Sequence, residues 1–110
     1  GRTQAEKQHI LSRSSDILKA EEIIRSVIDE EPLILAEPKP YVGISAQDGN
    51  TVTLSVGYWV NLENFGSASF QYEERIREAF DRSGIQFARK TLDLGYTDRQ
   101  TGRENESEAG

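Results

Sequence analysis

Apolar and polar residues alternate most strictly between residues 41 and 61. In the second half of this stretch every other side chain is apolar, and this period of two predicts a half-buried strand. The apolar positions are Val52, Leu54, Val56, Tyr58 and Val60. The first half alternates in the same way at Val42, Ile44 and Ala46, and residues 47–50 have turn composition that tolerates positive φ. We therefore expect a β-hairpin.

Parity sets the register of this hairpin, because residues that face the core must pair with residues that also face it. A two-residue loop would place Ile44 opposite Thr53 and is therefore excluded. A three-residue loop at residues 48–50 instead places Ile44 opposite Leu54 and Val42 opposite Val56.

The residues before the hairpin have helical spacing. One apolar face is formed by Ile17, Ala20, Ile24, Val27 and Ile28. Ser15 or Asp16 is suited to the N-cap, and Pro32 cannot continue a helix because it lacks an N–H group. The pattern predicts a helix over residues 16–30.

A second helix is expected after Asn64 and Gly66. Its apolar face consists of Tyr72, Ile76, Ala79 and Phe80. Ser67 or Ser69 could cap it, and Gly84 is placed to end it in a left-handed conformation.

Weaker strand signals lie at both ends of the chain. Residues 9–12 form a short candidate first strand, and Leu92, Leu94 and Tyr96 alternate with polar or small residues as a last strand. The resulting order, (β)αββαβ, predicts an α+β fold: a ferredoxin-like two-layer sandwich, with a mostly antiparallel sheet and two helices on one face. We expect an N-terminal segment at residues 1–14, the α+β domain at residues 15–96 and a disordered acidic tail at residues 97–110.

Composition narrows the possible functions. The chain of 110 residues is long enough for one domain, and its formal charge of −6 argues against a phosphate-binding surface and hence against nucleic acid. Without cysteine it has neither disulfides nor thiolate metal ligands, and no apolar stretch approaches the length of a membrane span. The missing initiating Met leads us to expect a fragment excised from a longer protein, with the cytosol as its default compartment.

Candidate catalytic chemistry is sparse. His9 is the single histidine, and we expect it to be a surface imidazole at the start of a strand. Adjacent glutamates point about 100° apart on a helix and read as solvated faces rather than as an acid/base pair. The glycines form no phosphate-binding series. We therefore predict no catalytic residue, no cofactor site and no metal site.

Trp59 is the most informative single residue. The alternation places it on the face of the strand opposite Leu54 and Val56, away from the core, and Tyr41 lies on that face beside Gly57. An aromatic ring over a strand glycine would cover its backbone. Trp59 and Tyr41 are candidate subunit-interface residues. The alternative is that a terminal residue or the proline-rich segment of the same chain covers Trp59.

Several segments in the same order resemble the cytoplasmic C-terminal domain of small-conductance mechanosensitive channels. They are PLILAEPKP at residues 32–40, VGI at 42–44, the DGN turn at 48–50, VTLSVGYWV at 52–60 and ERIREAFDRSGI at 74–85. The resemblance implies a non-catalytic vestibule domain of a tension-gated channel that releases ions and small solutes under osmotic stress. It further implies a homo-oligomeric ring, taken as a heptamer, on the cytoplasmic side of the inner membrane, with the membrane segments upstream.

Two other interpretations stay open at this point. One is a stand-alone α+β regulatory or RNA-binding module, since RNA-recognition modules share the strand order. The other is a small enzyme of acylphosphatase-like topology, for which Arg13 would be the anion-binding residue near the first strand. Salt-dependent binding of single-stranded RNA with quenching of Trp59 would favour the first, and hydrolysis lost in Arg13→Ala would favour the second.

Overall fold

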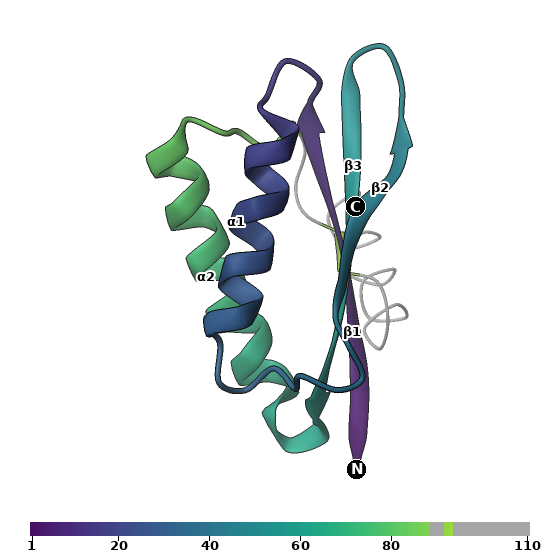
Figure 1. Cartoon of the computed structure of the whole chain (residues 1–110), viewed down its shortest axis with the longest axis vertical. Coiled ribbons are helices and arrows are strands. Elements are labelled where there is room, and N and C mark those ends of the chain that lie inside the picture. The colour runs from purple at the N-terminus through teal and green to yellow at the C-terminus, as the bar shows by residue number, and fades with distance from the viewer. Residues whose placement is uncertain (89–91, 94–110) are drawn as a thin grey trace, which may run out of the picture.

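Two helices cover one face of an antiparallel sheet in the computed structural model, which describes residues 1–88 and 92–93 (Figure 1). The elements in chain order are β1 (Arg2–Ser12), α1 (Ile17–Glu30), β2 (Tyr41–Gln47), β3 (Thr51–Asn61), the 3-10 turn η1 (Leu62–Asn64), α2 (Phe65–Ser83) and β4 (Leu92–Asp93). The strand order is β2-β3-β1-β4, and every neighbouring pair is antiparallel. This is the ferredoxin-like sandwich that the sequence predicts.

Strand β1 lies in the interior of the sheet and is much longer than the predicted strand at residues 9–12. It has 11 residues and pairs with β3 along its whole length, from Arg2 opposite Asn61 to Ser12 opposite Thr51. It also carries β4 on its other edge. The first residues of the chain thus belong to the same sheet as the rest of the fold. Of the predicted last strand, residues 94–96 lie outside the described residues, as do residues 97–110.

The hairpin has the predicted pairing at its open end. Ile44 lies opposite Leu54, Val42 opposite Val56, and Tyr41 opposite Gly57. The prediction of this register is therefore confirmed.

The position of the extra residue that produces this register differs from the prediction. Near the turn Gln47 pairs with Val52, and the register shifts at Ser45, which is a β-bulge. The regular strands end at Gln47 and begin at Thr51, but the Asp48 N–H also donates to the Thr51 carbonyl at 3.0 Å, so only Gly49 and Asn50 lie beyond the last backbone hydrogen bond of the hairpin. Excluding a two-residue loop was wrong, because the odd residue sits in the strand. The turn also needs no positive φ, since within the described residues only Gly84 has one.

The helix ends follow local capping chemistry. Asp16 caps α1 by accepting a hydrogen bond from the Lys19 N–H at 3.0 Å, as predicted. Helix α2 begins at Phe65 with Asn64 at the N-cap position, so the predicted caps Ser67 and Ser69 are wrong and lie inside the helix. Gly84 ends α2 with φ 71°, which confirms the predicted left-handed stop.

The core lies between the helices and the sheet. Its fully enclosed large side chains include Leu11, Ile24, Leu54, Val56, Tyr72, Ile76 and Phe80. Burial of each such side chain stabilises the fold by about 1.5–3 kcal/mol relative to leaving it exposed. Ile44 faces the helix layer but is 50% exposed, because the hairpin tip extends beyond α1 (Figure 1). Within residues 1–88 and 92–93, no helix combines the length and the apolar character that crossing a bilayer requires.

Candidate functional site

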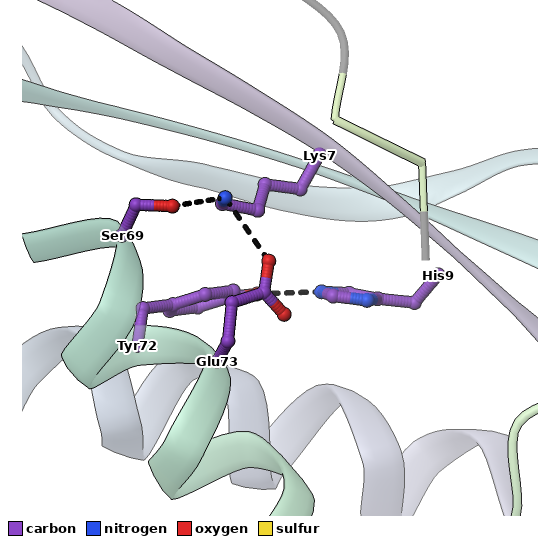
Figure 2. Close-up of polar contacts among 5 residues, drawn as sticks. All are labelled: Lys7, His9, Ser69, Tyr72 and Glu73. Atoms are coloured by element: carbon purple, nitrogen blue, oxygen red, sulfur yellow. Dashed lines mark hydrogen bonds and ion pairs between the residues drawn. The ribbon is translucent and has the colours of Figure 1, made fainter. Parts of the chain in front are cut away.

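Two polar side chains of β1 point into the core. Along this strand Ala5, Lys7, His9 and Leu11 occupy alternate positions and face the helices. Lys7 is 1% exposed and His9 is 0% exposed. Figure 2 shows both side chains directed at α2, where they meet Ser69, Tyr72 and Glu73. We call these five residues the polar cluster.

Lys7 is enclosed by partners from a single face of α2. Its Nζ donates to the Ser69 Oγ at 2.7 Å and lies 3.0 Å from the Glu73 Oε2. The same nitrogen lies 5.9 Å from the centroid of the Tyr72 ring. Spacings of three and four residues along α2 bring these partners together above Lys7. A buried ammonium group needs such an anion and such acceptors, because an unpaired charge in the interior is strongly destabilising.

His9 forms the second polar link to α2. Its Nε2 and the Tyr72 hydroxyl are 2.8 Å apart, and the two rings stack with centroids 5.8 Å apart. Burial, helped by the positive charge of Lys7, lowers the pKa of His9 to about 4. Burial and the Glu73 charge raise the pKa of Tyr72 well above its usual value. At neutral pH both partners of this hydrogen bond are therefore uncharged.

The polar cluster is better suited to holding β1 against α2 than to catalysis. The side chains of Lys7, His9 and Tyr72 are at most 1% exposed, so a substrate could not reach their reactive atoms. The expected surface position of His9 is wrong, because β1 is an interior strand and places this residue on its core side. Within the described parts of the chain, no group of histidine and acidic side chains has the arrangement of a metal site.

The sequence contained a signal for the polar cluster that simple alternation hides. Ala5, Lys7, His9 and Leu11 occupy every second position and therefore share one face of the strand. Because two of the four are polar, the apolar alternation that would reveal this face is lost. The helical partners Ser69, Tyr72 and Glu73 share one helix face. Reading the two patterns together would have suggested that Lys7 meets Glu73.

The outer face of the sheet carries the two predicted interface residues. The Tyr41 ring lies directly over Gly57, where an added Cβ atom would come within 2.2 Å of the Tyr41 Cε2. This confirms the predicted cover of the strand glycine. The Tyr41 hydroxyl donates to the Glu6 Oε2 at 3.3 Å, and burial and the nearby Glu6 charge raise the pKa of Tyr41. Tyr41 is still 44% exposed.

Trp59 lies one step further along the same face and is half-buried. The guanidinium carbon of Arg2 is 5.8 Å from the centroid of the indole ring, a cation–π distance. A terminal residue thus covers part of Trp59, as the intrachain alternative expects. The remaining exposed part leaves the interface role of Trp59 and Tyr41 a prediction.

Arg13, the anion-binding candidate of the enzyme interpretation, has another role in the structure. Its Nη1 donates to the Asp48 carbonyl at 2.9 Å and to the Gln47 Oε1 at 3.2 Å. The side chain therefore ties the turn after β1 to the turn of the hairpin.

Known proteins that resemble this chain include members of a channel family and a designed protein. Residues 11–87 match the family described as "Mechanosensitive ion channel MscS, C-terminal", which is not an enzyme family. The closed-state crystal structure of MscS from Helicobacter pylori is 24% identical, with a TM-score of 0.70 over 86% of this chain. A de novo designed protein with a ferredoxin fold, solved by NMR, is 22% identical, with a TM-score of 0.50 over 84% of this chain and 86% of its own. This chain spans only 38% of the Helicobacter pylori chain. At these identities the two solved structures establish the fold alone.

Proposed function

Because the chain belongs to the MscS family of mechanosensitive ion channels, as a C-terminal domain of that family, we propose that it builds the cytoplasmic vestibule of a tension-gated channel. The family match over residues 11–87 carries this proposal. In the proposed role the domain is not an enzyme. It frames the passage through which ions and small solutes leave the cell under osmotic stress.

Assembly into a homo-oligomeric ring, a heptamer in this proposal, needs a rigid subunit with a contact surface. Rigidity is supported by the continuous pairing of β1 with β3 and by the polar cluster that ties β1 to α2. Trp59 and Tyr41, on the outer face of the sheet, are the proposed subunit contacts. Amphipathic aromatic residues of this kind are enriched in protein interfaces.

The decisive test measures current in membrane patches. The gene that encodes this chain is expressed in a bacterium lacking its own mechanosensitive channels, and suction is applied to excised patches. Tension-gated currents are expected, together with improved survival of the cells after a hypo-osmotic shock. Absence of both, in cells whose membranes contain the protein, would contradict the proposal.

A further inference from the structure

A groove lies between α1 and the connection to β2, residues 31–40. Figure 1 shows this connection passing below the end of α1. The groove is open on one side and has a volume of about 400 Å³, within the usual range of small-molecule sites. The Leu35 N–H donates to the Trp59 carbonyl at 2.8 Å, and Ile34 forms a β-bridge with Val60. The connection is therefore held against β3 by backbone contacts, and the wall of the groove is preformed.

Apolar side chains form the floor of this groove. Ile28 of α1, Ile34 of the connection and Val42 of β2 all line it, and each is at most 8% exposed. Leu35 adds a half-buried side chain. The solvent-accessible apolar part of the lining comes mainly from Leu35, Ala36 and Pro40, and a ligand with an apolar portion would displace water from these side chains.

Four charged side chains also line the groove, and all four are exposed. Arg25 and Lys39 are cationic, whereas Asp29 and Glu37 are anionic, so two positive and two negative charges sum to zero. Among the residues that the structure describes, no ion pair involves any of them. Arg25 Nη2 donates to the Val42 carbonyl at 2.9 Å, which positions the guanidinium and leaves its other N–H donors for a ligand.

We infer that this groove binds a small zwitterion with an apolar side chain, the chemical class of the free branched amino acids. The ligand carboxylate pairs with Arg25 and Lys39, and its ammonium group pairs with Asp29 and Glu37. Its apolar portion packs on the floor. A ligand with one charge gains attraction from one pair and meets repulsion from the other, so both charges are needed for binding.

An added β-strand is a less suitable occupant of this region. Arg25 already occupies the carbonyl of Val42 on the edge strand β2, and the bulge at Ser45 bends the rest of that edge. Both features are devices by which proteins protect sheet edges from pairing.

The test is a titration of the 110-residue chain, followed by amide NMR shifts. L-leucine is compared with leucinamide, which lacks the carboxylate, with 4-methylpentanoate, which lacks the ammonium, and with glycine, which lacks the apolar portion. Saturable shifts confined to the groove are expected for leucine, with binding at least about tenfold weaker for each analogue. The inference does not rest on the proposed channel function, because the isolated chain is titrated.

Two variants and a matched control complete the test. Lys39→Gln and Asp29→Asn are each expected to weaken leucine binding about two- to fivefold, since each removes one exposed ion-pair partner. Lys19→Gln alters an exposed cation on the opposite flank of α1 and should leave binding unchanged. No saturable shifts, equal binding of a singly charged analogue, or equal losses in Lys19→Gln would overturn the inference. So would shifts of the groove amides on dilution of the chain alone, which would indicate a second copy as occupant.

Discussion

At neutral pH the His9 imidazole is neutral and enclosed between β1 and α2, and its protonation in the folded state is therefore unfavourable. Its pKa falls from 6.5 to about 4 on folding. Above pH 6.5 the imidazole is neutral in both the folded and the unfolded chain, so it costs no stability. As the pH falls, the unfolded chain binds a proton that the folded chain does not bind, and the free energy of unfolding declines until about pH 4. By pH 5 the loss amounts to about 2 kcal/mol.

His9→Gln tests this pH dependence, because glutamine can still bond the Tyr72 hydroxyl but does not titrate. Urea unfolding at pH 7 and pH 5 is the measurement. The natural chain should lose about 2 kcal/mol more than the variant between these values. Equal losses would mean that His9 titrates in the folded state as it does in the unfolded chain.

Within the described part of the chain, Glu73 forms an ion pair that offsets the cost of burying Lys7. Glu73→Gln should lower the free energy of unfolding by about 2–3 kcal/mol. This is less than for a fully buried pair, because the Glu73 side chain is 33% exposed. Denaturant unfolding measures the loss, and Glu74→Gln is the matched control, since Glu74 pairs with Arg77 on the exposed face of the same helix. That control should change stability by less than about 1 kcal/mol.

A double variant separates the charge effect from general damage to the helix. In Lys7→Met with Glu73→Gln, both charges are removed and an apolar side chain of similar length replaces the lysine. Most of the loss seen in Glu73→Gln should be recovered, because no uncompensated buried charge remains. If the double variant is as unstable as Glu73→Gln alone, the charge explanation fails.

At the scale of the elements, the bulge at Ser45 explains the pairing of the hairpin. Gln47 pairs with Val52, which leaves an even number of residues between them, and the one extra residue at Ser45 still brings Ile44 opposite Leu54. Deleting Ser45 leaves a regular ladder in which Ile44 still faces Leu54. Deleting Gly49 shortens the two-residue turn and forces the strands out of register. We expect cross-strand contacts of Ile44 with Leu54 to survive the first deletion, with a small change in the unfolding midpoint. The second deletion should lower the midpoint far more, and equal effects would argue against the bulge.

The success of prediction from sequence differed between elements for physical reasons. Helix α1 was predicted almost to the residue, because an apolar stripe, the Asp16 cap and Pro32 all agree. Most of β1 was missed, because Lys7 and His9 occupy core positions that pairing with α2 makes acceptable. Parity predicted the pairing in the hairpin but not the bulge, since an odd residue fits the pattern equally well in the loop or in the strand. The polar cluster combines two distant segments, so its geometry required the fold.

For the whole molecule, the outer face of the sheet decides whether the proposed ring has the right contacts. Trp59 is only partly covered by Arg2, and Tyr41 beside it is 44% exposed. In the channel protein that carries this domain, Trp59→Ser should shift the detergent-solubilised assembly toward smaller species, measured by sedimentation. Loss of a central interface tryptophan commonly costs more than about 2 kcal/mol of binding.

The matched control for this change is Leu18→Ser, because Leu18 is a large apolar side chain that is 74% exposed on α1, in the helix layer rather than on the outer face. It should leave the assembly unchanged. Circular dichroism of the isolated chain should show both variants folded, since neither side chain is buried in the core. If Trp59→Ser leaves the assembly unchanged, or if Leu18→Ser weakens it equally, then the outer face of the sheet is not the subunit interface.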